Sequence, residues 1–286
     1  MSPSGDVILV PLHRHEVKLN VVRFDFGFKY HINNFLRVEA AIPYEIKSQD
    51  ANIVELEPAD SVQKEAMLRN QDIHHRNETY RGISDMDILF GYSTHGILMQ
   101  HDTLFAKFGT TLPLGKTEED PWILGDNGLK HLHIQFGTGT FNPISDLRYS
   151  MPIYGGLSGN VSVRGKYPFY ENSKKYRGSW DVTYTAGLNY IVSNWITLQT
   201  SYLGLYQSYA HWAGEKDINT GLRFSMASLG ASIATPYNVP LSITVMLPIQ
   251  QETLYDDNVR LSDGTYQEND AFKLGILVSV MALYSF

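Results

Sequence analysis

Apolar and polar residues alternate with a period of two along most of the chain, in segments of about ten residues. The last segment shows the alternation most plainly. One of its faces consists of Phe272, Leu274, Ile276, Val278, Val280, Ala282, Tyr284 and Phe286. Because successive side chains of a strand point to opposite sides of a sheet, the pattern predicts strands whose two faces meet different surroundings.

The same alternation predicts ten further strands upstream. They cover residues 22–30, 36–45, 85–92, 104–109, 146–153, 160–166, 181–190, 196–202, 219–235 and 241–250. In the strand at 219–235, Leu222, Phe224 and Met226 are assigned to the apolar face and Arg223 to the polar one. An even strand number is needed if both termini lie on the same side of a closed barrel, so residues 6–12 are assigned as a first, short strand. Only residues 60–70 have helical spacing.

The predicted connections alternate in length. Short turns fall at 31–34, 155–156, 193–194 and 236–238, with a slightly longer one at 95–101, and long connections fall at 48–80, 114–143, 171–179, 208–218 and 252–270. Outer-membrane barrels have short periplasmic turns and long extracellular loops. We therefore expect an all-β fold: a transmembrane antiparallel up-and-down β-barrel of about 12 strands, with residues 1–286 as a single domain.

The C-terminal residues support this expectation. An alternating last strand that ends on Phe286, with Tyr284 two positions earlier, is typical of the assembly signal of outer-membrane barrels. The last strand of a closed barrel must pair with the first, because open sheet edges are not tolerated in lipid. An edge strand of a soluble barrel is the alternative interpretation.

Composition narrows the class of protein. The chain is 43% hydrophobic and 19% charged, but no apolar run reaches the roughly 18 residues of a membrane-spanning helix. It has 18 Tyr, 13 Phe and 4 Trp, which suits aromatic girdles at the membrane interfaces. The absence of Cys excludes disulfides and thiol chemistry, and a net charge of −7 argues against nucleic acid as a partner. The first residues do not resemble a signal peptide, so an exported form is expected to have lost one.

Four segments carry a family resemblance. They are Phe26-Gly27-Phe28-Lys29-Tyr30 followed by Asn33-Asn34-Phe35-Leu36 and Ala41-Ile42-Pro43-Tyr44, then Gly82 to Asp87, Gly109 to Lys116, and Gln135 to Thr140. Together they resemble the MetA-pathway phenol-degradation family of outer-membrane barrel proteins. The resemblance implies a transporter-like or porin-like barrel. This chain departs from the family's pattern at Ser84, Leu114 and Asn142.

The predicted inner faces carry charges of both signs. The candidates for lining or constricting the lumen are Arg23, Asp25, Arg37, Glu39, Asp85, Asp87, Lys107, Arg148, Arg164 and Arg223. Further inward charges are predicted at Lys29, Glu45, Asp146, Lys166, Asp181 and Lys273. Two interpretations remain open: a polar lumen that guides a solute, or a packed set of ion pairs that fills a narrow barrel.

No catalytic, cofactor or metal site is predicted. His74-His75 and His131-x-His133 have ligand-like spacing, but they lie without Asp or Cys nearby and are interpreted as loop histidines. Asp85, Asp87 and His95 could act as acid–base partners of an outer-membrane hydrolase. No Gly-x-Ser-x-Gly signature accompanies them, so we expect no enzyme.

The expected function is passage of small hydrophobic or aromatic solutes across the bacterial outer membrane. Inward Leu277, Met281 and Leu283 would form an apolar part of the lumen wall. The expected partners are outer-membrane lipid, the barrel-assembly machinery and the solute. The alternative is a scaffold barrel with a closed lumen that anchors surface loops or a protein partner. In that case the apolar residues of 48–80 would plug the lumen or dock the partner.

Overall fold

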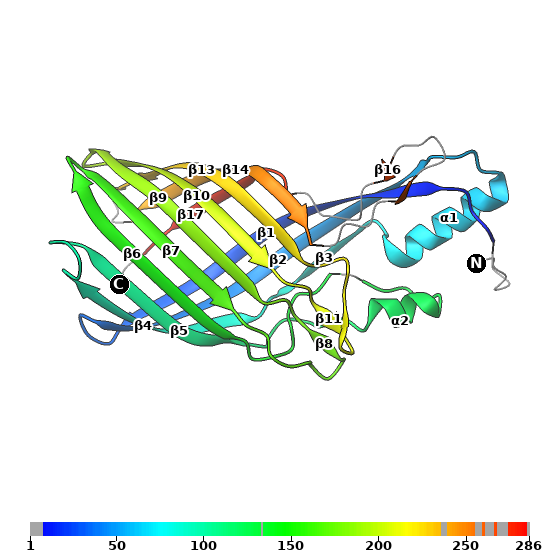
Figure 1. Ribbon diagram of the computed structural model, residues 1–286, viewed down its shortest axis with the longest axis horizontal. Helices are drawn as coiled ribbons and strands as arrows, with labels where there is room; N and C mark the ends of the chain where they lie inside the picture. Colours follow the sequence, from blue (N-terminus) through cyan, green and yellow to red (C-terminus); the bar gives the residue numbers. More distant parts are fainter. Residues whose placement is uncertain are drawn as a thin grey trace.

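The computed structural model describes residues 8–132, 134–235, 239–254, 259–260, 266–267 and 274–284. Within them, twelve antiparallel strands form one sheet that curves round on itself (Figure 1). They are β1 His13–His31, β2 Leu36–Glu55, β3 Glu78–Ile83, β4 Met86–His95, β5 Thr103–Leu112, β6 Pro143–Tyr154, β7 Leu157–Lys166, β9 Asp181–Ser193, β10 Ile196–Gln207, β13 Leu222–Ile233, β14 Leu241–Thr253 and β17 Leu277–Ala282.

The strands pair in chain order, β1-β2-β4-β5-β6-β7-β9-β10-β13-β14-β17, and β3 pairs with β2 beside this path. This arrangement confirms the predicted up-and-down topology. Three short strands make a separate small sheet: β8 Tyr176–Arg177, β11 His211–Trp212 and β12 Glu215–Lys216. A pair of two-residue strands, β15 Val259–Arg260 and β16 Tyr266–Gln267, lies between β14 and β17 in the chain.

Two helices lie in the long connections: α1 Ser61–His74 and α2 Pro121–Asp126. The helix predicted at 60–70 is confirmed. Asp60 caps α1, because its side chain accepts a hydrogen bond from the Gln63 backbone N–H while the Gln63 side chain accepts one from the Asp60 N–H. In the described residues, neither helix has the length and apolar content needed to cross a membrane.

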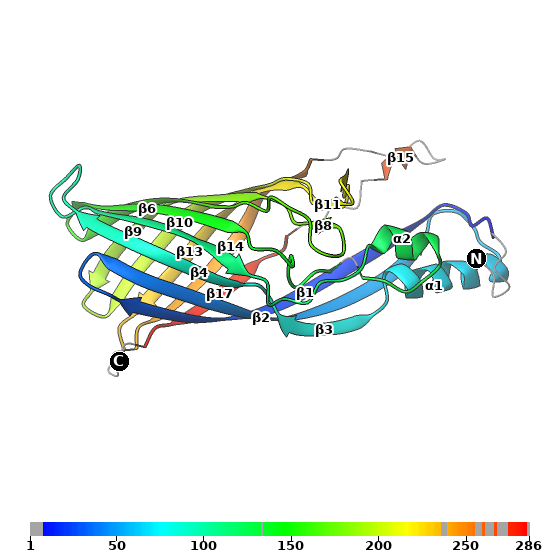
Figure 2. The same cartoon turned by 90° about the horizontal axis from the view of Figure 1, so that it is seen from below.

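Short and long connections separate to opposite ends of the sheet (Figures 1 and 2). The links β1–β2, β6–β7 and β9–β10 lie at one end with the C-terminal strand, as the alternation of loop lengths predicts. The predicted turn 236–238 lies outside the described residues. At the other end, β1 and β2 project beyond the remaining strands, and α1 and α2 lie beside this extension.

The extension corrects two predictions. The long connection expected at 48–80 is shorter, because β2 continues to Glu55 and β3 begins at Glu78. Residues 8–12 are not a first strand. Pro11 lacks the N–H that a ladder needs, and the Leu12 carbonyl accepts hydrogen bonds from Leu56 and Glu57, which continues the β1–β2 hairpin. The twelfth strand is β3, and residues 6 and 7 lie outside the described part.

The first described residues also lie at the end opposite the one predicted. The Gln63 side chain donates to the Leu9 carbonyl, which places this segment beside α1 with the long connections. β1 and β17 are the two ends of the strand order, and the described residues show no pairing between them. Ten antiparallel pairings separate them along this order, so β1 and β17 run in the same direction.

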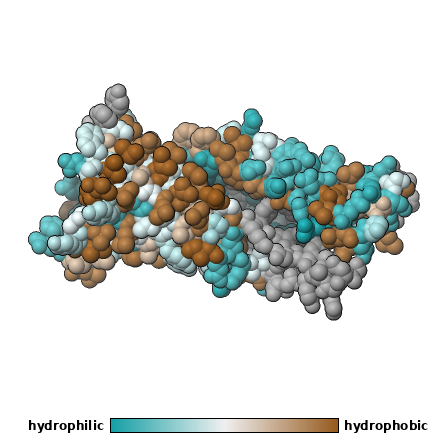
Figure 3. All heavy atoms as spheres, turned by 90° about the horizontal axis from the view of Figure 1, so that it is seen from above, coloured by the Kyte–Doolittle hydropathy of each residue, from teal (hydrophilic) through white to brown (hydrophobic). Residues whose placement is uncertain are grey.

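The outer face of the sheet is apolar. Phe90 and Phe108, which face each other across β4 and β5, are each 64% exposed, and Val278 and Val280 on β17 are each 65% exposed. Figure 3 shows such apolar residues gathered over the curved sheet, with hydrophilic residues prevailing towards the extension. This distribution suits a surface that contacts lipid.

The predicted faces of β13 are reversed. Met226 is 0% exposed and pairs with inward Leu203, whereas Leu229 is 67% exposed and pairs with outward Val245. β13 carries large apolar residues on both faces, so its alternation could not tell them apart. A register shift between Ser225 and Met226 also interrupts its pairing with β14.

The apolar outer face leads to a direct test. Val278→Arg should destabilise the folded protein in lipid vesicles by about 2–4 kcal/mol, because a cation would then face the hydrocarbon. Ser279→Arg is the matched control, since Ser279 pairs with Thr244 on the inner face. Urea unfolding of both variants measures the effect. Equal destabilisation would contradict the assignment of the two faces.

Candidate functional site

Charged side chains gather on the inner face of β1, β2, β4, β5, β6 and β7. Cross-strand pairing puts Lys107 opposite Asp146 and Asp146 opposite Arg164, so these residues share one face of the sheet. The ion pairs fall into two groups that differ in exposure.

The first group is a buried ion-pair chain made of Arg37, Glu39, Lys107 and Asp146. Arg37 Nε lies 2.7 Å from Glu39 Oε1, Lys107 Nζ lies 2.9 Å from Glu39 Oε2, and the same ammonium lies 3.5 Å from Asp146 Oδ2. These four side chains are only 9–17% exposed. Charges so far removed from water must be paired, so the ion-pair chain is a packing element that joins β2, β5 and β6.

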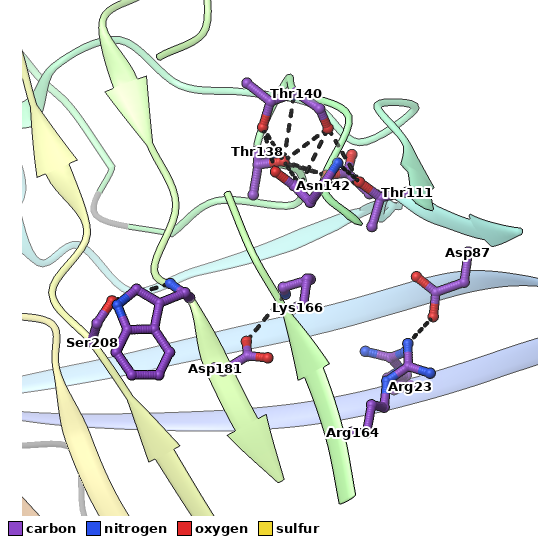
Figure 4. A network of polar contacts seen from close by, with 12 residues as sticks. Arg23, Asp87, Thr111, Thr138, Thr140, Asn142, Arg164, Lys166, Asp181 and Ser208 are labelled. Atoms are coloured by element: carbon purple, nitrogen blue, oxygen red, sulfur yellow. Dashed lines mark hydrogen bonds and ion pairs between the residues drawn. The ribbon is translucent and has the colours of Figure 1, made fainter. Parts of the chain in front are cut away.

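The second group, the open charge group, consists of Arg23, Asp25, Asp87 and Arg164. Arg164 Nη2 donates to Asp87 Oδ2 at 2.7 Å, although β5 and β6 separate their strands. This contact therefore runs over β5 and β6 along the inner face of the sheet. Arg23 pairs with Asp25 at 2.8 Å and also attracts Asp87, beside which Figure 4 places it.

The open charge group is accessible to solvent. Its side chains are 28–53% exposed, in contrast to the ion-pair chain. Asp146 connects the two groups, because its Oδ2 lies 3.8 Å from Arg164 Nη1 as well as near Lys107. A polar solute inside the sheet would therefore meet the open charge group and not the buried chain.

Asp85 lies apart from both groups. Its carboxylate accepts hydrogen bonds from the Gly115 N–H at 3.1 Å, the Thr138 N–H at 2.8 Å and the Thr138 hydroxyl at 2.8 Å. It therefore fastens the connection between β5 and β6 to the start of β4. The sequence places Asp85 with Asp87 among the candidates that line the lumen. In the structure, both carboxylate oxygens of Asp85 bind Gly115 and Thr138 instead.

Thr138, which donates to Asp85, belongs to a threonine–asparagine network. Figure 4 shows its members Thr111, Thr138, Thr140 and Asn142. Asn142 is 0% exposed, and its Nδ2 donates to Thr138 Oγ1 at 2.7 Å and Thr111 Oγ1 at 3.0 Å. Thr140 Oγ1 donates to Asn142 Oδ1 at 2.8 Å. The sequence did not predict this network, since Thr111 is far in the chain from the other three members. The Gly-Thr-Gly segment at 137–139 was the available signal.

Two glycines allow this packing. A Cβ on Gly137 would lie 2.3 Å from Asp85 Oδ1, and a Cβ on Gly115 would lie 2.6 Å from the Gly137 Cα. The two backbones therefore touch where any side chain would separate them. Three of the four segments that carry the family resemblance meet at this contact.

The remaining predicted residues lie elsewhere. Arg148 is exposed on the inner face of β6, opposite Phe105, and forms no ion pair within the described residues. Arg223 belongs to the outer face, because it pairs with Tyr206, and its guanidinium lies 3.9 Å from Glu252. Its assignment to the lumen was wrong for the same reason as the faces of β13. Lys273 and Phe286 lie outside the described residues, and Tyr284 is 67% exposed.

The histidines at the extension are closer together than their sequence positions suggest. His74 Nδ1 lies 2.9 Å from His131 Nε2, and His131 is only 4% exposed, so its interpretation as a surface-loop histidine is wrong. Burial, followed by the nearby His131 and His15, lowers the pKa of His74 to about 4. The predicted partner His133 lies outside the described residues.

A hollow of about 390 Å³ lies over β6, β7, β9 and β10. Its lining includes Val161, Leu188 and Tyr202, which belong to the outer face. It is therefore a depression in the apolar surface and not the interior of the sheet.

Comparison with known proteins identifies the fold. No family model and no curated protein matches the chain. Among solved structures, the chain is similar to an outer membrane channel from Pseudomonas putida F1, with a TM-score of 0.55 and 10% sequence identity. The match covers 95% of this chain and 85% of the other. The chain has the fold of an outer-membrane β-barrel. The resemblance to the phenol-degradation family stays a prediction.

The glycine contact makes a testable prediction. Gly137→Ala should destabilise the protein by about 1–3 kcal/mol, because the new methyl group displaces the half-buried Asp85 carboxylate from its donors. Urea unfolding in detergent measures the change. Gly27→Ala is the control, since nothing lies within 4 Å of a Cβ there. A Gly137→Ala protein as stable as the control would show that the contact is not needed.

Proposed function

We propose that the protein is a channel of the bacterial outer membrane that passes small hydrophobic or aromatic solutes. Its barrel fold, apolar outer face and charged inner face support this role. The similar structure from Pseudomonas putida F1 is itself described as an outer membrane channel. We also propose that outer-membrane lipid and the barrel-assembly machinery are its partners.

The observation that carries the proposal is the open charge group. Arg164 and Asp87 meet on the inner face of the sheet, and their side chains remain 35% and 28% exposed. A barrel filled only for stability would bury such charges completely or replace them, because desolvated ions stabilise little. Partly solvated charges on an inner face suit the lining of a passage.

The opposite wall of the interior is apolar, which supports hydrophobic solutes. Leu203 on β10 pairs with Met226 on β13, and Leu205 pairs with Phe224. Further along the sheet, Met246 on β14 pairs with Leu277 on β17. An aromatic solute could lie against this wall while its polar group faces the open charge group, as in mostly apolar ligand sites with a few polar groups.

The open charge group leads to a prediction about ion selectivity. Asp87→Asn removes the partner of Arg164 and leaves an extra positive charge in the interior, so the channel should become more selective for anions. Reversal potentials in planar bilayers under a salt gradient measure this shift. Glu252→Gln is the control, because Glu252 pairs with Arg223 on the outer face. A wild-type protein that folds but gives no current would contradict the channel and favour the scaffold.

The apolar wall leads to a prediction about the entry of hydrophobic solutes. Leu205→Asn should lower entry of a hydrophobic aromatic probe at least about twofold, because a polar amide weakens apolar contact. Fluorescence of N-phenyl-1-naphthylamine in intact cells reports entry through the outer membrane. Thr185→Asn is the control, since Thr185 pairs with Leu203 but is already polar. Equal entry in both variants, at equal protein levels, would contradict a hydrophobic route along this wall.

A further inference from the structure

Five histidines from three segments gather beside the extension of β1 and β2. They are His13 and His15 on β1, His74 and His75 at the end of α1, and His131 after α2. Ring centroids lie 5.1 Å apart for His13–His15, 5.4 Å for His15–His75, 6.2 Å for His74–His75 and 4.5 Å for His74–His131. We call them the histidine cluster.

The hydrogen bonds of the cluster fix which nitrogens carry lone pairs. His131 Nδ1 lies 2.9 Å from the Leu129 carbonyl, which can only accept, so Nδ1 carries the hydrogen. His131 Nε2 then has the lone pair, and His74 Nδ1 donates to it at 2.9 Å. His13 Nδ1 likewise donates to the Pro11 carbonyl at 2.9 Å. Metal-binding histidines characteristically donate their second ring nitrogen to a carbonyl or carboxylate in this way.

The surroundings hold the central pair in place. A Cβ on Gly125 would lie 3.1 Å from Cε1 of both His74 and His131, so α2 covers the two rings closely. The His131 N–H donates to the Ile73 carbonyl, and Arg76 Nη1 donates to the His131 carbonyl.

We propose that the histidine cluster binds a divalent transition-metal ion of the class that prefers imidazole, such as Zn²⁺, with His74 and His131 as its first two ligands. The ion would take the place of the hydrogen between the two nitrogens, and that hydrogen would move to His74 Nε2 through solvent. The rings of His15 and His75 are next in reach, and water completes the shell.

Binding of the ion requires the His74 and His131 rings to move slightly apart. Ligand distances of about 2.0–2.1 Å in a tetrahedral shell put two nitrogens roughly 3.3 Å apart, so His74 and His131 must separate by about 0.4 Å. Among the described residues, no three His, Asp or Glu side chains share a metal-binding arrangement before such a movement. Binding would tie α1, the segment after α2 and β1 together, at a place separate from the open charge group.

Metal binding is measured on the purified protein in detergent, with any polyhistidine tag removed and metals stripped by a chelator. Titration with ZnCl₂ in a calorimeter should show one strong site per chain. His131→Ala and His74→Ala should each weaken that site more than tenfold. His95→Ala is the control, because His95 hydrogen-bonds Thr103 at the link between β4 and β5, away from the cluster. Co²⁺ in place of Zn²⁺ should give the visible absorption of tetrahedral nitrogen coordination.

Two outcomes would overturn the proposal: no saturable site in the wild type, or a site that survives in the His74→Ala/His131→Ala double variant. Each variant is first checked for folding by its heat-modifiable mobility on a gel. If His131→Ala does not fold, His74→Gln replaces it, since Gln keeps a side-chain donor for the hydrogen bond but is a poor zinc ligand. The channel recordings described above do not depend on these histidines.

Discussion

The register of β2, β5 and β6 depends on the neutralisation of the buried Lys107 ammonium. Its ammonium lies between the carboxylates of Glu39 and Asp146, at 2.9 Å and 3.5 Å, and is only 11% exposed. A single buried cation would be costly, so β2, β5 and β6 must keep the register that brings both carboxylates to it. Because Asp146 also contacts Arg164, this buried arrangement holds one side of the open charge group in place.

The two walls of the interior differ in chemistry: one is charged and the other is apolar. On one side, charges that are buried and paired fix the strands, while those of the open charge group stay partly exposed to solvent. On the other side, β10, β13 and β14 present leucine, phenylalanine and methionine. Phe224 and Met226 of β13 point inward, opposite to the face predicted from the sequence, and they make this wall apolar. Such a division suits solutes that are mostly apolar with one polar group.

Apart from β3, the strands of the main sheet, their order and the inner position of Asp87 and Arg164 could be predicted from the sequence, because lipid and water impose a period of two on each strand. The faces of β13 could not, since Met226 and Leu229 are equally apolar. The role of Asp85 could not be predicted either, because its partners Gly115 and Thr138 are distant in sequence and reach it only through tertiary packing. Capping by Asp60 is local, so α1 was predictable.

We propose that Asp87 lines a water-filled passage. The chain has no Cys, so Asp87→Cys would provide a single thiol as a probe. In planar bilayers, a charged methanethiosulfonate reagent added to this variant should reduce the single-channel current, and the Cys-free protein should not respond. Current through Asp87→Cys that stays unchanged, after mass spectrometry has shown that the thiol is modified, would show that Asp87 does not line the passage.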